Sequence, residues 1–357
     1  MTAKRFASLD VFRGLTVFLM IVVNTPGAGA APFAQLVHAG WTGLTLADLV
    51  YPSFLFAVGS ALAFARLTAR PAAAFLIAVG KRAATIFAIG VLMYWFPFTT
   101  PFAEARIPGV LQRIALCYLI AAPACRWLDQ RQLVLLCAAL LTAHTLALML
   151  FGAPGQAFAK VGNAGSRLDE FLLGAQHLYR RDGGFDPEGL LGTLSASVNV
   201  IAGYLCARAI LRQVPLTRLA AWGAALVVAG CLLALGIPIG KKLWTAPFVL
   251  VTTGIDLCVM ALLAGYVEGR GEEGAQGYFV RFFAIYGRNP LAIYLVSELL
   301  AVALGLLPEN PYGWAGVHVF QAVAPGPIGS LLAAIAFALL CWLVGLALHR
   351  RGLILKV

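Results

Sequence analysis

The sequence predicts an all-α, polytopic membrane protein of about ten transmembrane helices, and three observations support this prediction. The 357 residues are 61% hydrophobic and only 11% charged, whereas soluble domains are closer to one half apolar. The apolar residues gather in separate runs of roughly 17–25 residues, the length that crosses a bilayer as a helix. Most basic residues fall between these runs. We therefore expect a chain that crosses a lipid bilayer repeatedly.

Ten apolar runs are expected to span the membrane. Their approximate limits are 10–26, 47–65, 83–99, 108–125, 132–151, 190–208, 219–237, 247–266, 288–306 and 328–348. A shorter run at 71–80 is expected to be a helix that lies on the membrane surface. The segment 152–189 is the one sizeable stretch outside the membrane, and its length favours a lid or a substrate-binding loop. We expect residues 1–357 to form a single transmembrane domain with 152–189 as an external loop.

The net charge of +11 would suit a nucleic-acid partner only if the basic residues clustered on one face. Threading the chain through the ten spans instead places sixteen Lys and Arg residues on the side of the two termini and seven on the other. Basic loops stay in the cytoplasm, so we expect cytoplasmic termini and no nucleic-acid partner. The start of the chain resembles a cleavable signal peptide. Asp10 and Arg13 interrupt its apolar run, so an uncleaved first helix is expected.

The seven cysteines give no sign of a metal site or a disulfide framework. They lie mostly inside apolar runs, without a CxxC pattern or a Cys/His spacing typical of metal ligands. We expect them to pack as small buried residues, and we expect no metal in this protein.

The first span carries two polar residues on one face. Arg13 and Asn24 are eleven positions apart, so they are separated by about 16 Å along the helix axis. A cation near the cytoplasmic end and an amide near the external end would line a long ligand that crosses the membrane. The alternative is that Arg13 pairs with Asp10 or reaches lipid phosphates. Both interpretations stay open.

The loop after the first span carries His38, followed by Trp41 and then by Asp48 at the head of the next span. A neutral imidazole is the usual general base near physiological pH, and a nearby carboxylate fixes its tautomer. His38 and Asp48 are therefore a candidate base and its orienting partner, with Thr45 as the expected N-cap of the second span. On spacing alone, such a histidine is more often structural or merely exposed.

Buried charges in the later spans also need partners. Arg106 and Arg113 fall on one helix face in RIPGVLQR, and Arg113 is expected about 10 Å inside the bilayer. Asp256 and Glu298, both near mid-membrane by position, are its candidate partners. Matched charges would form a structural network, whereas an unpaired carboxylate would favour a proton or substrate path.

Two further segments begin helices. In YGRNPLAIY, Arg288 and Asn289 precede Pro290, and a helix N-terminus beside an arginine suits a phosphate; positive-inside anchoring is the alternative. In FDPEGLLGTL, Asp186 is expected to cap the span over 190–208, with Pro187 in its first position.

Five ordered motifs resemble those of the heparan-α-glucosaminide N-acetyltransferase family and its bacterial relatives, within the wider transmembrane acyltransferase group. They are SLDVFRG followed by Asn24, HAGWTGLTLADLVYPSFLF, RIPGVLQRIALCY, DPEGLLGTL and YGRNPLAIY. The chain departs from the eukaryotic members in the fourteen positions from Asn24 to His38, a longer connection that is rich in Ala and Pro. We also expect no luminal domain before the first span, and hence an acceptor other than heparan sulfate.

The resemblance implies a multi-pass acyltransferase of the bacterial inner membrane. It would move an acetyl group from cytoplasmic acetyl-CoA, its co-substrate, to the amine of an amino sugar or glycan at the periplasmic face. The resemblance makes His38, in HAGW, the catalytic histidine and Asn24 the active-site asparagine. We expect His38 to take a proton from the amine and Asn24 to donate to the oxyanion. An acetyl-histidine relay stays open.

The resemblance also gives roles to residues that the spacing left undecided. Asp48 is expected to orient the histidine. The candidates for holding CoA are Arg13, Trp41, Arg113, Arg288 and Asn289. Self-association into a homo-oligomer is left open.

The alternative function is a membrane transporter for a sugar or amino sugar. It is motivated by ten spans and by two carboxylates near mid-membrane. Transporters often contain repeated halves, and none is visible in the sequence.

Overall fold

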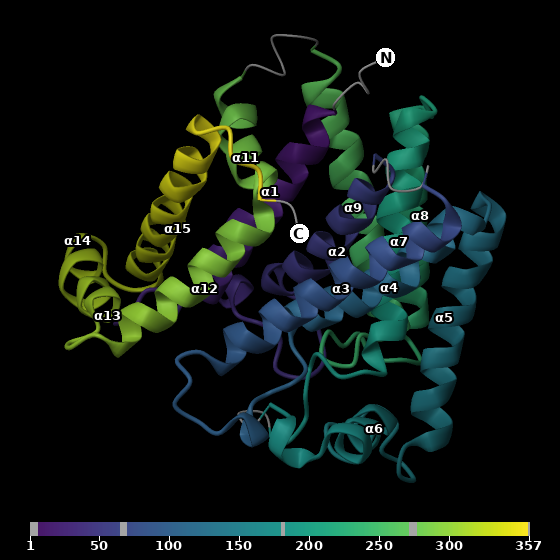
Figure 1. Ribbon diagram of the computed structural model, residues 1–357, viewed down its shortest axis with the longest axis horizontal. Helices are drawn as coiled ribbons and strands as arrows, with labels where there is room; N and C mark the ends of the chain where they lie inside the picture. Colours follow the sequence, from purple (N-terminus) through teal and green to yellow (C-terminus); the bar gives the residue numbers. More distant parts are fainter. Residues whose placement is uncertain (1–5, 65–69, 180–182, 271–276, 356–357) are drawn as a thin grey trace. The chain divides into compact units, whose positions relative to one another are not determined.

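The computed structural model describes residues 6–64, 70–179, 183–270 and 277–355. All regular secondary structure in these residues is helical, which confirms the all-α prediction. The helices are α1 (Ala7–Asn24), α2 (Leu46–Leu62), α3 (Ala72–Trp95), α4 (Val110–Trp127), α5 (Gln130–Phe151), α6 (Ala164–Leu173), α7 (Gly192–Leu211), α8 (Leu216–Leu233), α9 (Ala246–Val267), α11 (Tyr278–Arg288), α12 (Pro290–Leu306), α13 (Pro311–Ala315), α14 (Gln321–Val323) and α15 (Pro327–Arg350) (Figure 1).

Every predicted span coincides with a helix, but fewer than ten qualify as membrane spans. Among the described residues, seven helices are long and apolar enough, namely α1, α3, α5, α7, α8, α9 and α15. Counting the bent pair α11–α12 as one span gives up to eight. Helix α2 is a shorter apolar helix of 17 residues. Helix α4 carries Gln112, Arg113 and Arg126, which lower its hydropathy. The multi-pass prediction is confirmed, whereas the count of ten is not.

Two details of the sequence-based boundaries were wrong. The expected surface helix at 71–80 is instead the beginning of α3, which runs without a break for 24 residues. The expected span over 288–306 is bent by 78° where α11 meets α12. Pro290 explains this break because it begins α12 and cannot donate a backbone hydrogen bond to the preceding turn.

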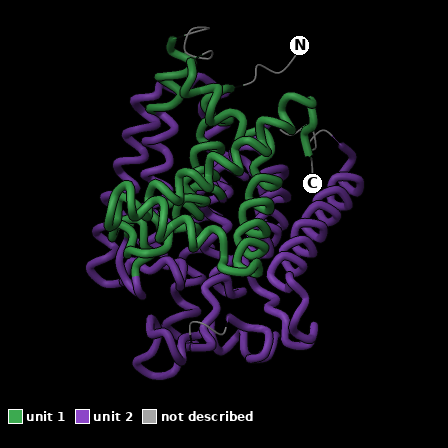
Figure 2. Tube along the Cα trace, turned by 90° about the vertical axis from the view of Figure 1, so that its left-hand side faces the viewer, with its two compact units in different colours: residues 1–39, 45–54, 262–356 green, residues 40–44, 55–261, 357 purple. Residues whose placement is uncertain are grey.

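The chain divides into two compact units, which Figure 2 shows in green and purple. The first comprises residues 1–39, 45–54 and 262–356, and the second comprises 40–44, 55–261 and 357. The single domain expected from the sequence stays a prediction.

In the first unit, α1 packs against α11 at very short range. A Cβ added to Gly14 would lie 1.8 Å from the carbonyl oxygen of Phe283, and one added to Gly287 would lie 2.0 Å from that of Asp10. Small residues let helix backbones approach in this way inside a membrane. Val11 and Val280 are fully buried beside this crossing. Gly14 and Gly287 therefore fix the position of α1, the helix that carries Arg13 and Asn24.

The second unit uses the same device between α2 and α7. A Cβ on Gly59 would lie 1.7 Å from the carbonyl oxygen of Val200, and one on Gly203 would lie 1.9 Å from that of Phe56. Ser60 reinforces the contact because its hydroxyl donates to the carbonyl of Gly203 over 3.1 Å. Helix α7 also packs against α4 and α5, so it forms the centre of this unit.

Candidate functional site

The structure brings His38 and Asp48 together within the first unit. Nδ1 of His38 lies 3.0 Å from Oδ1 of Asp48. The side chain of Asp48 is fully buried, while that of His38 is 44% exposed. The second carboxylate oxygen, Oδ2, accepts hydrogen bonds from the backbone nitrogens of Ala39 and Thr45, both over 3.1 Å. The buried carboxylate therefore fixes the loop, while the imidazole it holds reaches the surface of the unit.

Local sequence explains why the carboxylate sits there. Thr45 and Asp48 flank the start of α2 in a T-x-x-D pattern, in which the fourth residue reaches back to the backbone nitrogen of the first. The Thr45 hydroxyl lies 3.0 Å from Oδ2 of Asp48 and 2.9 Å from the carbonyl oxygen of Val37, which ties the helix start to the residue before His38. If Nδ1 of His38 donates to Asp48, Nε2 carries the lone pair that accepts a proton.

Asn24, the last residue of α1, is exposed within its unit. Its amide nitrogen donates to Oε1 of Glu298 on α12 over 3.0 Å. The turn that follows is held as well, because the hydroxyl of Tyr312 donates to the carbonyl of Thr25 over 2.6 Å. The backbone nitrogen of Gly27 also donates to the carbonyl of Ser330 over 3.1 Å. The C-terminal end of α1 is thus fastened by three later helices of the same unit, α12, α13 and α15.

Arg13 on α1 contacts both its own helix and α11. Its guanidinium lies 3.6 Å from Oδ1 of Asp10, one turn earlier, and donates to the carbonyl of Gly287 on α11 over 3.1 Å. The pairing with Asp10 left open by the sequence is therefore present. A role for Arg13 in holding CoA stays a prediction.

Arg288 and Asn289 lie at the break between α11 and α12 but differ in their surroundings. The amide of Asn289 donates to the carbonyl of Leu353 over 3.0 Å and accepts from the nitrogen of Leu355 over 2.8 Å. These two hydrogen bonds tie the C-terminal segment to the break between α11 and α12. Arg288 contacts His349 and lines a cavity of about 480 Å³.

That cavity is basic at several points. Arg281, Arg288, His349 and Arg350 line it together with Asp10, and its other walls come from apolar side chains of α1, α11 and α15. The spacing of the sequence singled out Arg288 but missed the other basic residues. Arg281 lies on α11 about two turns before Arg288, whereas His349 and Arg350 lie on α15 and come close because α15 packs against α11.

The remaining predicted residues, Arg113 and Trp41, belong to the second unit. Arg113 was expected to pair with Asp256 or Glu298. Among the described residues no ion pair within 4.0 Å joins it to Asp256, and Glu298 belongs to the first unit, so a pairing with Glu298 stays a prediction. Nη2 of Arg113 donates to the carbonyl of Gly189 over 2.9 Å, and its guanidinium lies over the ring of Trp244, 5.1 Å from the centroid. A carbonyl and an aromatic face contact this buried cation, while its Nε and Nη1 are buried without a hydrogen-bond partner.

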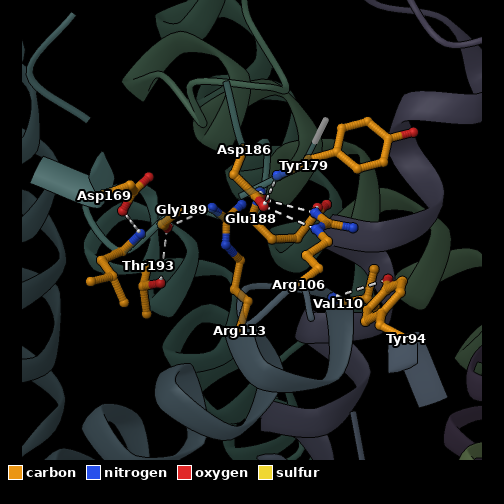
Figure 3. A network of polar contacts seen from close by, with 11 residues as sticks. Tyr94, Arg106, Val110, Arg113, Asp169, Tyr179, Asp186, Glu188, Gly189 and Thr193 are labelled. Carbon is orange, nitrogen blue, oxygen red and sulfur yellow. Dashed lines mark hydrogen bonds and ion pairs between the residues drawn. The ribbon is translucent and has the colours of Figure 1, made fainter. Parts of the chain in front are cut away.

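Arg106 is the centre of a charge network in the same unit (Figure 3). It forms a two-point contact with Asp186 at 2.9 and 2.7 Å and reaches Glu188 at 2.5 Å. Its guanidinium also lies over the ring of Tyr179. Burial lowers the pKa of Arg106, but the two carboxylates outweigh this effect and raise the pKa above its ordinary value. The network fastens the end of the 152–189 segment to the approach to α4.

This network corrects the expected helix cap. Asp186 was predicted to cap the span over 190–208, but α7 begins at Gly192 and its N-cap is Leu191. The Asp186 carboxylate instead accepts from the backbone nitrogens of Tyr179 and Glu188, both over 3.0 Å. An acidic residue before a helix resembles an N-cap in sequence, but here the Asp186 carboxylate binds Arg106 instead of the start of α7.

Trp41 also serves the 152–189 segment. Its indole nitrogen donates to the carbonyl of Phe158 over 2.8 Å, and its ring meets that of Phe185 edge to face at 4.9 Å. These contacts give Trp41 a structural role within the second unit, and its predicted contact with CoA stays a prediction.

The fold and the site define a class, a multi-pass helical membrane protein in which a buried aspartate holds an exposed histidine. A family model described as the catalytic part of heparan-alpha-glucosaminide N-acetyltransferase matches residues 5–169. Over this region the chain is similar to the heparan-alpha-glucosaminide N-acetyltransferase family.

Two curated relatives carry that name. The protein from Mus musculus is 26% identical over 367 residues, which cover 84% of this chain and 54% of the relative. The protein from Homo sapiens is 26% identical over 359 residues, which cover 83% of this chain and 53% of the relative. The chain spans about half the length of the curated relatives it matches.

Proposed function

We propose that this protein is an integral-membrane acetyltransferase that moves an acetyl group from acetyl-CoA to the amine of an amino sugar or glycan. The observation that carries the proposal is the His38–Asp48 pair at 3.0 Å, which lies inside the region matched by the family model. The names of the two relatives supply the reaction class. The location proposed is a bacterial inner membrane, with the donor in the cytoplasm and the acceptor at the periplasmic face.

The proposed reaction is addition and elimination at the thioester carbon. The acceptor nitrogen attacks this carbon while Nε2 of His38 takes a proton from the amine. Asp48 stabilises the resulting imidazolium through Nδ1, and Asn24 donates an N–H group to the oxyanion. When the carbon–sulfur bond breaks, the CoA thiolate leaves and the proton on His38 can pass to it. A relay through acetyl-histidine uses the same residues in two steps.

The basic cavity in the first unit is the proposed location of the phosphates of CoA. Phosphate esters are recognised by guanidinium groups, which offer several donors in a plane. The cavity offers Arg281, Arg288 and Arg350 along with apolar walls. Its volume of about 480 Å³ is in the range of small-molecule sites. Arg288 therefore remains our candidate for the donor, while Asn289 is engaged with the C-terminal segment.

The alternative function is transport of a sugar or amino sugar, and one of the two observations that motivated it is weakened by the structure. It relied partly on Glu298 as a carboxylate available to a substrate or proton path. In the structure Glu298 accepts a hydrogen bond from Asn24, which connects it to the proposed acetyl-transfer residues.

The test is acetyl transfer by the purified protein. Radiolabelled acetyl-CoA and glucosamine are incubated with the wild-type protein and with the variant His38→Ala. We expect labelled N-acetylglucosamine from the wild type and a loss of about 10³-fold or more in the variant, because the general base is removed. His318→Ala is a matched control, since His318 is exposed and stacks on Trp314. Unchanged transfer in His38→Ala would remove His38 from its role, and no transfer by the wild type to any amino sugar would contradict the proposed function.

A further inference from the structure

Glu298 lies in a helix of the proposed membrane region. Its carboxylate contacts an amide and, among the described residues, no cation. It lies on α12, and its Oε1 accepts from the amide nitrogen of Asn24 over 3.0 Å. In the described ranges, no ion pair within 4.0 Å involves Glu298. An ionisable side chain in a membrane helix is costly unless it is paired or serves a function. The pairing of Glu298 with Asn24 therefore calls for a chemical role in addition to a structural one.

The chemistry of the pair determines the orientation of the Asn24 amide. An asparagine side chain can present either its oxygen or its nitrogen to a neighbour, but an ionised carboxylate can only accept hydrogen bonds. Glu298 therefore selects the orientation with the nitrogen toward α12. One N–H of Asn24 is used by Glu298, and the second N–H remains for another acceptor.

The surroundings keep this geometry fixed. The Tyr312 hydroxyl holds the carbonyl of Thr25, and the Ser330 hydroxyl donates to the carbonyl of Gly27 over 2.9 Å. The backbone after Asn24 is consequently anchored at two points, and the side-chain amide is anchored at a third. A donor that stabilises a developing charge must be oriented before the reaction, because reorientation during the reaction raises the barrier.

We propose that Glu298 is a positioning residue for acetyl transfer, which orients the second N–H of Asn24 toward the oxyanion of the thioester. The inference rests on the proposed function and adds a residue to it. Glu298 acts through Asn24 and has no contact of its own with the reacting atoms. Replacing its carboxylate with an amide lets the pair form in two orientations, one of which presents the Asn24 oxygen to the oxyanion.

The experiment compares steady-state kinetics for the wild type, Glu298→Gln, Asn24→Ala and the double variant. We expect Glu298→Gln to lower kcat about 10-fold or more while the KM for acetyl-CoA stays within about twofold, because orientation matters in the transition state. In the Asn24→Ala background, Glu298→Gln should change kcat by less than about twofold, since a residue that acts only through Asn24 has nothing left to orient. Glu298→Asp, which keeps an acceptor-only group, should recover part of the loss.

Controls separate positioning from folding and from the proposed function itself. Glu309→Gln makes the same chemical change at an exposed position and should keep wild-type kcat. Elution volume and thermal unfolding in detergent establish that Glu298→Gln is folded. Wild-type kcat in a folded Glu298→Gln variant, or an equal loss with and without Asn24, would overturn the inference while acetyl transfer by the wild type stands. Absence of transfer by the wild type would instead contradict the proposed function, and with it this inference.

Discussion

Nδ1 of His38 lies 3.0 Å from Oδ1 of Asp48, ten residues later in the chain. Oδ2 of the same carboxylate is held by Ala39 and Thr45. Because the carboxylate is fully buried, its orientation is set by the start of α2 before any substrate arrives. The imidazole consequently has a preferred tautomer in the resting protein.

The first prediction concerns Asp48→Asn. Both backbone groups that approach Oδ2 are donors, so the amide must place its own N–H group against a donor at one side or the other. We expect kcat for acetyl transfer to fall by about 10²- to 10⁴-fold because the tautomer of His38 is no longer enforced. Steady-state kinetics on purified protein measure the change.

Thr45→Val is the control for this prediction. It removes the hydroxyl that contacts Asp48 and Val37 but leaves the His38–Asp48 contact. Loss of such a group at a helix start costs about 1 kcal/mol of stability, while kcat should stay within a few-fold of wild type. A folded Asp48→Asn variant with wild-type kcat would contradict the role of the pair.

The second prediction concerns the close crossing of α1 and α11. Gly14→Ala would place a methyl group 1.8 Å from the backbone carbonyl oxygen of Phe283, and backbone cannot move aside without separating the helices. We expect a loss of about 2 kcal/mol or more in unfolding free energy, measured as a lowered thermal unfolding midpoint in detergent.

Gly305→Ala provides the matched control. Gly305 lies in α12, and a Cβ there would have nothing within 4 Å. Alanine is the better helix former by about 1 kcal/mol, so this variant should be unchanged or slightly more stable. Equal destabilisation by the two substitutions would refute the interpretation that helix contact, rather than helix propensity, requires Gly14.

The helices could be predicted from sequence because bilayer thickness imposes a length on apolar runs. Each of the ten runs coincides with a helix, and Pro290 begins one as expected. The boundary between a surface helix and a span was not predictable at 71–80, since the apolar pattern continues through Lys81 and Arg82 into α3. Pro290 accounts for the break, but the size of the bend, 78°, depends on how the flanking helices pack, which a run of apolar residues does not encode.

The site was predictable where partners are close in sequence and not where they are distant. His38 and Asp48 are ten residues apart, and the predicted contact is present. Glu298 is 274 residues from Asn24, and the sequence named it only as one of two candidate partners for Arg113, because charge matching alone cannot say which helices are neighbours. Arg113 donates instead to the carbonyl of Gly189, a kind of partner that sequence patterns do not reveal.

The third prediction concerns Arg106, which lies between two carboxylates. Arg106→Met would leave Asp186 and Glu188 without their cation, and removing one partner of a buried ion pair costs about 3–5 kcal/mol. We expect the 152–189 segment to become sensitive to trypsin or chymotrypsin at concentrations that leave the wild type intact. Limited proteolysis followed by mass spectrometry locates the cleavage.

Arg167→Met is the control within the same segment. Arg167 is exposed on α6 and donates to the carbonyl of Phe151 over 2.9 Å, so its loss should cost less than about 1 kcal/mol. If both variants were cleaved at equal rates, the Arg106 network would not be what fastens the segment.

The last prediction is a pH dependence that arises from Asp169 on α6. Asp169 is 1% exposed, and burial raises the pKa of its carboxyl group from 3.8 to about 6, with Asp186 adding to the increase. Oδ1 accepts from the backbone nitrogen of Leu190 over 2.8 Å, which opposes the increase only in part. Asp169 therefore binds a proton more tightly in the folded protein than in the unfolded chain.

The sign of the effect follows from this difference in pKa. Below about pH 4 the group is protonated in both states, whereas between about pH 4 and 6 the folded state keeps a proton that the unfolded chain has released. Stability from this group is thus lost as pH rises through 6, by at most about 3 kcal/mol. Asp169→Asn removes the titration and keeps an oxygen for Leu190. Its thermal midpoint relative to the wild type should therefore increase between pH 4 and 7, and parallel midpoints for the two proteins across that range would contradict the assignment.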